Sequence, residues 1–256
     1  MKHDHILTAV LLLSLSAVSF ALTNETSPEP QYFFSLGSYI GGGTVSSDET
    51  VKNSGGYGIT FEREWFLGHD FGNLVVGPRL EAVNSFVNTR AERQGSSFVY
   101  NYDNRIIAAG IHLGRFFGSS PDMSTPSTSL VREIYINAMA GKSYSKLTID
   151  ENAERRYVQH YYNGIQGDYF AGELGVMIPI RAGFYCNVAA MNSSYKAHQK
   201  DATGTYEESN VVDAEKPQGG YSLRTVDGVH SDARLLNADT LYQKTFGLKV
   251  SVSIGW

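Results

Sequence analysis

The chain has 256 residues, a formal net charge of −5 and a single cysteine, Cys186. Its mild acidity argues against nucleic acid as a partner, because neutralising phosphates requires a basic face. A single cysteine excludes a disulfide within the chain, so noncovalent contacts must hold the fold. The abundance of glycine (26), tyrosine (16) and phenylalanine (13) suits strands better than helices.

The amino terminus predicts a cleaved secretory signal over residues 1–21. Its apolar run is too short to cross a membrane as a helix and ends at Ser19-Phe20-Ala21, where small residues flank a bulky one as signal peptidase requires. Residues 22–31 contain two prolines and predict a disordered leader. Residues 32–256 are then the folded domain.

Eight segments of this domain alternate between apolar and small or polar side chains, as strands with two different faces do. An exported chain can cross a membrane as a closed barrel, because closure pairs every backbone group. An even strand count is expected for a single-chain bacterial barrel. We therefore predict an all-β fold: a closed, antiparallel, up-and-down transmembrane β-barrel of eight strands. The segments are 32–45, 55–66, 73–88, 98–117, 131–149, 165–180, 183–195 and 241–256.

The connections alternate in length, which predicts long loops at one end of the barrel and short turns at the other. The expected outer loops are 46–54, 89–97, 150–164 and 196–240. The expected inner connections are 67–72, 118–130 and 181–182. In the long loop 196–240, segments 205–212 and 221–226 can pair as a hairpin, so ten strands stay open as an alternative.

Facing follows from the alternation on the clearer strands. Tyr57, Ile59, Phe61 and Trp65 are expected to face lipid, and Pro78 implies a bulge or a missing ladder bond because proline has no N–H. Aromatic residues cluster near both ends of most segments, which predicts a girdle at each membrane interface.

The inward positions predict a polar lumen. An eight-stranded barrel is just wide enough inside for side chains to fill it. Because both signs of charge occur, we expect ion pairs that plug the lumen, with a conducting or catalytic interior as alternatives. Lys249 is expected to pair with Glu62, Glu81 or Glu173, and His112 is a further inward candidate. The predicted lumen network is Glu62, Glu64, Arg79, Glu81, Glu173 and Lys249.

No catalytic or metal pattern is present in the sequence. No His-x-Ser pair lies on a predicted strand, no metal-ligand spacing occurs, and the glycines at 41–43 lie within a strand and not before a helix. We expect no enzyme activity, no cofactor and no metal. The loop 150–164 is both basic and aromatic, which suits sugar rings or lipopolysaccharide phosphates, although a loop that packs on itself and on the rim is the favoured explanation. Its binding candidates are Arg155, Arg156, Tyr157, His160, Tyr161 and Tyr162.

The last segment carries apolar residues at alternate positions up to an aromatic carboxyl terminus: Tyr242, Val250, Val252, Ile254 and Trp256. With the signal and the eight segments, this pattern resembles small bacterial outer-membrane barrels of the OmpA/OmpX and opacity-protein (surface antigen) type. In those families the last strand is the assembly signal read by the barrel assembly machinery and usually ends in Phe, where this chain has Trp256.

The resemblance implies a bacterial outer-membrane location with both termini periplasmic. It implies contact with outer-membrane lipid and lipopolysaccharide, and four outer loops that serve adhesion, host contact or envelope interaction. A narrow OmpW-like passage for small or apolar solutes is the main alternative. A lipid A-modifying barrel enzyme is a third, weaker alternative.

Overall fold

The computed structural model describes residues 31–45, 49–67, 71–93, 96–117, 129–153, 156–198, 203–210, 222–227 and 240–256. The predicted signal peptide and residues 22–30 of the predicted leader lie outside this part of the chain. Gln31, expected to end the leader, is instead the first residue of β1. No helix among the described residues is long and apolar enough to cross a membrane.

The described chain forms ten strands, and eight of them are long. They are β1 (Gln31–Val45), β2 (Glu49–Phe66), β3 (Leu74–Arg93), β4 (Ser96–Phe116), β5 (Glu133–Ala153), β6 (Arg156–Arg181), β7 (Phe184–His198), β8 (Thr203–Asn210), β9 (Ser222–Asp227) and β10 (Thr240–Gly255).

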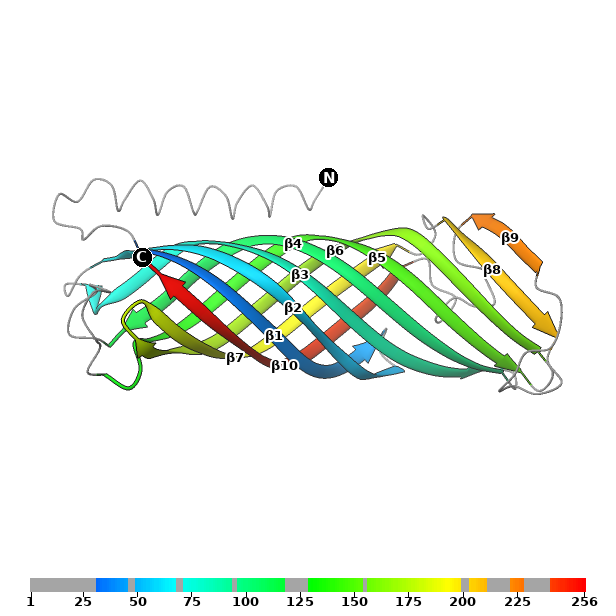
Figure 1. Cartoon of the computed structure of the whole chain (residues 1–256), viewed down its shortest axis with the longest axis horizontal. Coiled ribbons are helices and arrows are strands. Elements are labelled where there is room, and N and C mark those ends of the chain that lie inside the picture. The colour runs from blue at the N-terminus through cyan, green and yellow to red at the C-terminus, as the bar shows by residue number, and fades with distance from the viewer. Residues whose placement is uncertain are drawn as a thin grey trace.

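The eight long strands close into a ring. Their order is β5-β4-β3-β2-β1-β10-β7-β6, and β5 also pairs with β6, so no strand of the ring has a free edge over the barrel wall. Every pairing is antiparallel. The predicted eight-stranded, closed, up-and-down barrel is confirmed (Figure 1).

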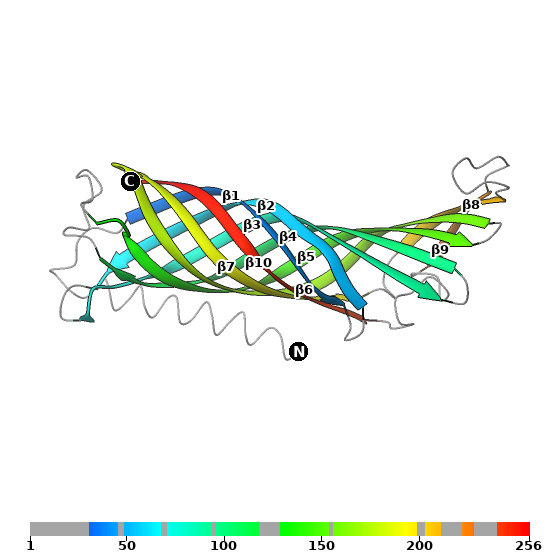
Figure 2. The ribbon, with the colours of Figure 1, turned by 90° about the horizontal axis from the view of Figure 1, so that it is seen from below.

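The two short strands, β8 and β9, form a hairpin outside the ring. β8 pairs with the first part of β6, from Arg156 to Asn163, and β9 pairs with β8. The barrel wall resumes at Gly167, where β6 begins to pair with β7. The predicted hairpin therefore exists, but a ten-stranded barrel is wrong, because the hairpin adds to the projecting end of β6 and leaves the ring unchanged (Figures 1 and 2).

The short connections, the start of β1 and the carboxyl terminus meet at one end of the barrel, which we call the turn end. There Tyr32 and Trp256 exchange two backbone hydrogen bonds, N to O, of 3.0 and 3.1 Å, and their rings stack with centroids 6.3 Å apart. β6 and β7 are joined by two residues, one of them Gly183 at φ 73°, a conformation that glycine adopts without strain. We call the opposite end, which carries β8 and β9, the hairpin end.

Several expected loops at the hairpin end are strands. β3 continues to Arg93 and β4 begins at Ser96. Likewise β5 continues to Ala153 and β6 begins at Arg156. The expected loops 89–97 and 150–164 are thus mostly paired backbone. Residues 89–97 and 150–160 are mostly polar, so alternation of hydrophobicity does not mark these strand ends, although one face of the projecting sheet still buries Ile149 and Tyr162.

Alternation of faces holds along the strands, with one exception and one interruption. Trp65, expected to face lipid, is only 2% exposed, and the Arg63 guanidinium lies 4.6 Å from its ring centroid. Near Pro78 the β2–β3 pairing stops after Glu62↔Arg79 and resumes at Trp65↔Val76 in the same register. A missing stretch of ladder therefore accommodates the proline, and no bulge forms there.

The expected aromatic girdles are only half right. Tyr57, Phe86, Tyr144, Tyr242 and Trp256 are exposed on the outside of the barrel. Phe71 and Phe117 are exposed as well, and Tyr32, Phe34, Phe66, Phe170 and Phe184 are half-buried. The remaining aromatics of the expected girdles are buried inside the barrel. These buried aromatics include Phe33, Phe116 and Tyr185 toward the turn end and Tyr100, Tyr102, Tyr169 and Tyr195 toward the hairpin end.

Candidate functional site

The centre of the lumen holds a cation shared between two carboxylates. Lys249 Nζ on β10 lies 2.5 Å from Glu81 Oε1 on β3 and 2.6 Å from Glu173 Oε1 on β6. Arg79 also reaches Glu173, with Nη2 3.2 Å from Oε2. All four residues are at most 8% exposed. Of the three partners expected for Lys249, Glu81 and Glu173 bond to it and Glu62 bonds to Arg79 instead.

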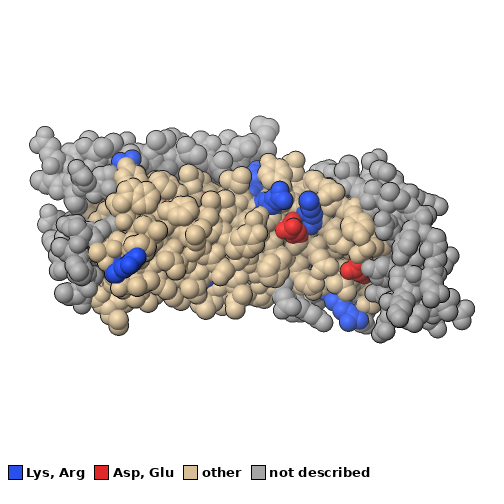
Figure 3. All heavy atoms as spheres, viewed as in Figure 1, with Lys and Arg blue, Asp and Glu red and all other residues tan. Residues whose placement is uncertain are grey.

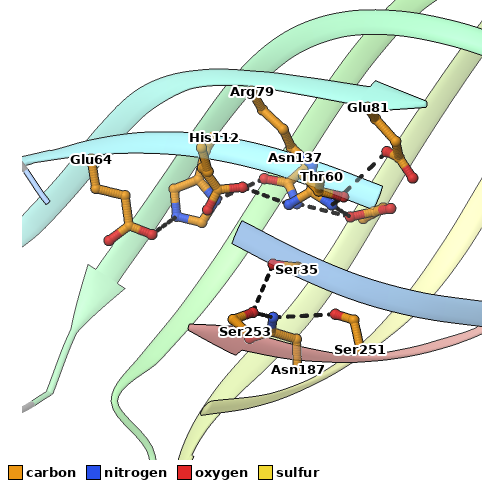
Figure 4. A network of polar contacts seen from close by, with 12 residues as sticks. Ser35, Thr60, Glu64, Arg79, Glu81, His112, Asn137, Asn187, Ser251 and Ser253 are labelled. Atoms are coloured by element: carbon orange, nitrogen blue, oxygen red, sulfur yellow. Dashed lines mark hydrogen bonds and ion pairs between the residues drawn. The ribbon is translucent and has the colours of Figure 1, made fainter. Parts of the chain in front are cut away.

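A second layer lies nearer the turn end and centres on His112 of β4. Arg79 Nη1 donates to Glu62 Oε2 at 2.6 Å. His112 Nδ1 lies 2.9 Å from Asn137 Oδ1 and 3.3 Å from Glu62 Oε1, and its Nε2 lies 2.5 Å from Glu133 Oε1. Asn137 in turn donates to Glu173 Oε2 at 2.8 Å, which joins this layer to the first (Figure 4).

Arg132 closes the lumen at the turn end. Its Nη1 lies 3.2 Å from both Glu64 Oε2 and Glu133 Oε2, and its other amino group bonds to Gln31. Aromatic rings surround the guanidinium carbon, with centroids of Phe33, Tyr185 and Phe116 at 4.7, 5.2 and 5.5 Å. Stacking on rings and forked hydrogen bonding are the properties that suit Arg, and not Lys, to such a position.

Hydroxyl and amide groups line the opposite wall. Ser35 of β1 and Ser253 of β10 share a hydrogen bond of 2.7 Å, and Asn187 of β7 donates to Ser251 and Ser253 (Figure 4). These residues face inward because they take the polar phase of their strands. Together with the two charged layers they line the interior, which in an eight-stranded barrel is just wide enough for side chains to fill.

The outside of the barrel is an apolar belt between two sets of charges. Outward-facing Arg63, Arg115 and Arg181 lie toward the turn end, and outward-facing Arg105, Lys142, Lys196 and Lys244 lie toward the hairpin end. Between these sets, the outward positions of the eight described ring strands carry no charged side chain. Figure 3 shows the broad uncharged face that results.

The height of the belt matches a bilayer. On β4, Arg105 and Arg115 are ten positions apart, and the outward residues between them are Ile107, Ala109, Ile111 and Leu113. At about 3.4 Å per residue and a tilt of about 40°, ten residues rise about 25 Å along the barrel axis, the height of the apolar band of outer-membrane barrels. The fold and this belt define a transmembrane β-barrel with a polar interior.

Four outward residues lie in one row across neighbouring strands at the hairpin-end edge of the belt. Lys142, Asp168, Lys196 and Tyr242 are consecutive register partners on β5, β6, β7 and β10. Lys142 Nζ lies 2.6 Å from Asp168 Oδ1, and Lys196 Nζ lies 5.6 Å from the centroid of the Tyr242 ring. Lysine and tyrosine are the side chains that anchor a barrel where apolar and aqueous environments meet.

The expected outer-loop candidates do not form a loop. Arg155 lies outside the described residues. Arg156, Tyr157 and His160 belong to β6, where β5 pairs on one side and β8 on the other. Tyr161 bonds through its hydroxyl to Gln159, and Tyr162 is buried at 1% exposure. The five described residues are therefore spread along the paired backbone of β6 and not along a loop.

The residues of the expected assembly signal share one outward face of β10. Tyr242, Val250, Val252, Ile254 and Trp256 are 41–61% exposed. The predicted lumen network lacks four residues that the structure includes. His112 is only a further candidate in the prediction, and Arg132, Glu133 and Asn137 are absent from it. Glu133 and Asn137 share the inward phase of β5 with Met139, a signal that the sequence does contain.

Comparisons with known proteins give weak similarities. No protein-family model matches the chain, and no curated protein matches it. Among solved structures, Ail, the attachment invasion locus protein of Yersinia pestis, has a TM-score of 0.35 at 10% identity, covering 90% of this chain and 100% of Ail. The translocator domain of the autotransporter NalP from Neisseria meningitidis has a TM-score of 0.23 at 10% identity, covering 99% and 97% of the two chains. Similarities at this level assign neither family nor function.

Proposed function

We propose that this chain is a surface protein of the bacterial outer membrane, with a lumen plugged by side chains and both termini in the periplasm. The apolar belt supports the membrane location, since exposed apolar area on this scale needs lipid or a partner to cover it. The short connections and both ends of the folded domain lie at the turn end, as expected for the periplasmic side. Lipopolysaccharide then surrounds the hairpin end, and the barrel assembly machinery reads the last strand.

The projecting sheet is the observation that carries this proposal. β6 begins at Arg156 and reaches the belt edge only at Asp168, twelve residues later, and β5, β8 and β9 pair alongside this projection. At about 3.3 Å per residue and the same tilt, the sheet stands roughly 30 Å above the membrane. This sheet serves contact with a host cell, a matrix protein or a neighbouring envelope component.

Whole-cell binding tests this display function. Bacteria that express the full chain should adhere to host epithelial cells or matrix proteins, and deleting residues 203–227 should abolish the gain at equal surface abundance. A deletion variant that binds as well as the wild type would refute display by this sheet.

Single-channel recording tests the plugged lumen against the OmpW-like alternative. In a planar bilayer the purified barrel should show no steady open state, because two charged layers and the Arg132 side chain cross its bore. A reproducible open state in the wild type that a Lys249 or Arg132 substitution alters would favour a passage. We propose no catalytic role: His112 bonds to Asn137 and Glu133 inside the barrel, and no serine is among its hydrogen-bond partners in the described chain.

A further inference from the structure

The turn-end layer of the lumen concentrates negative charge around one imidazole. Glu62 and Glu64 come from β2, His112 from β4 and Glu133 from β5, and none is more than 3% exposed. One ligand atom from each of Glu62, Glu64 and His112 lies within 4.8 Å of the others. The spacing of these residues in the sequence does not predict the cluster, because β3 lies between β2 and β4 in the sheet.

Arginines orient the carboxylates toward the imidazole. Arg79 holds Glu62 by Oε2 at 2.6 Å, and Arg132 holds Glu64 by Oε2 at 3.2 Å. The Oε1 atom of each carboxylate is thereby turned to His112, at 3.3 Å from Nδ1 for Glu62 and 3.7 Å from Nε2 for Glu64. Glu64 Oε1 is buried and has no hydrogen-bond partner. A buried carboxylate oxygen without a donor is costly unless a cation or proton meets it.

Charge counting within the lumen gives the same result. The described interior contains five carboxylates, Glu62, Glu64, Glu81, Glu133 and Glu173, and three permanent cations, Arg79, Arg132 and Lys249. Each carboxylate contacts one of these cations, but the permanent charges sum to −2 before His112 is counted. Lys249 pairs with Glu81 and Glu173, and Arg79 also pairs with Glu173. The excess negative charge therefore lies around Glu62, Glu64 and Glu133. One divalent cation would balance it.

We propose that His112, Glu62 and Glu64, with Glu133 as a fourth donor, bind one divalent transition-metal ion in the lumen. Imidazole and carboxylate together suit Zn²⁺, Mn²⁺ or Fe²⁺ better than Ca²⁺ or Mg²⁺, which prefer oxygen alone. Two ligands of one zinc ion lie about 3.3–3.5 Å apart, and Glu64 Oε1 lies 3.7 Å from His112 Nε2. With Nε2 on the metal, His112 Nδ1–H donates to Asn137 Oδ1, the second hydrogen bond that ligating histidines usually make. Two carboxylates would shift to reach this ion: Glu133 Oε1, which lies 2.5 Å from Nε2, and Glu62 Oε1, which lies 3.3 Å from Nδ1.

The carboxylate of Glu133 lies where Gly114 leaves room by having no side chain. A Cβ added at Gly114 would lie 1.6 Å from Glu133 Oε1. Glu133 thus occupies the position of a missing side chain, and Gly114→Ala would push its carboxylate away from His112. This substitution perturbs the cluster without removing any ligand.

Metal retention after refolding tests the proposal. The mature chain is refolded into detergent with EDTA or with Zn²⁺, and the heat-modifiable gel shift confirms that each variant has folded. Zn²⁺ content is measured after desalting. The wild type should retain about one ion per chain, and His112→Gln and Glu64→Gln should retain at least tenfold less. His160→Gln, which changes a histidine on the projecting part of β6, should retain as much as the wild type, and Gly114→Ala should fall between.

Two results would overturn the site. Folded wild type that holds no more Zn²⁺ than His112→Gln would mean that protons alone balance the carboxylates. Retention that falls in His160→Gln but not in His112→Gln would place the ion on the projecting sheet. Neither result bears on the display function, since adhesion and conductance are measured separately.

Discussion

Lys249 on the last strand and Glu81 on β3 meet across the lumen at 2.5 Å, although 168 positions separate them in the chain. β10 and β3 do not pair with each other, so this contact crosses the bore and does not run along the wall. Glu173 of β6 approaches the same ammonium group from a third direction. The ion pair therefore links parts of the wall that the backbone ladder connects only indirectly.

Removing the Lys249 charge should destabilise the barrel strongly. Lys249→Met leaves Glu81 and Glu173 in a buried site with one fewer cation, and breaking a buried pair in this way costs about 3–5 kcal/mol. The free energy of unfolding in urea, followed by the heat-modifiable gel shift in detergent, measures the effect. Lys244→Met, on the outward face of the same strand, is the matched control and should cost under about 1 kcal/mol. Equal losses from the two substitutions would contradict the buried network.

Replacing Arg132 should both destabilise the barrel and loosen its turn end. Arg132→Met keeps apolar contact with the surrounding rings but leaves Glu64 and Glu133 without their shared donor, which costs about 3–5 kcal/mol. Arg132→Lys should recover only part of this, because an ammonium group cannot reproduce the forked bonds and ring stacking. The urea midpoints of the two variants are compared with that of Arg115→Met. This control removes an arginine on the outward face of the barrel near the turn end. A lysine variant as stable as the wild type would show that charge alone matters at this position.

Alternation predicted the ring almost completely, and it did so because inward and outward positions differ chemically on every strand. β10 shows this best: Gln243, Lys249 and Ser253 are inside while Phe246 and Val252 are outside. The lengths of β5 and β6 could not be predicted in the same way. Their projecting parts are rich in polar residues, so hydrophobic alternation does not mark them, although one face there still buries Leu147, Ile149 and Tyr162.

The site was predicted where the phase of a strand was clear and missed where it was not. Glu62, Glu81 and Glu173 lie on strongly alternating strands and were placed inside. Arg132 lies just before β5, and its long side chain extends into the lumen. Because it is not part of a strand, the alternation of the strand does not predict where it points. The predicted aromatic girdles were partly wrong for a related reason. They were based on position along each strand and not on which face a residue takes, and Phe33 and Tyr185 share the inward face of Ser35 and Asn187.

Charges on the outer face of β10 should block insertion. Val252 and Ile254 are 50% and 44% exposed within the apolar belt, so Val252→Asp with Ile254→Asp places two carboxylates against lipid. A basic residue at the bilayer midplane costs about 2–4 kcal/mol and an acidic one less, and the same change disrupts the proposed assembly signal. The amount of heat-modifiable barrel in isolated outer membranes should fall at least tenfold. Val252→Ala with Ile254→Ala, which keeps the same face apolar, is the control, and wild-type levels in the double aspartate variant would disprove a role for this face.

Deleting residues 202–239 should leave the barrel assembled. The ring closes through β10 pairing with β7, from Thr240↔His198 to Ile254↔Phe184, and none of these pairs includes the deleted segment. In the ring-side ladder β8 pairs with the projecting part of β6, which keeps β5 as its partner on the other side. The urea midpoint and the gel shift of the deletion variant should therefore match the wild type within experimental error. Degradation of the variant, or loss of its gel shift, would mean that the hairpin supports closure of the ring.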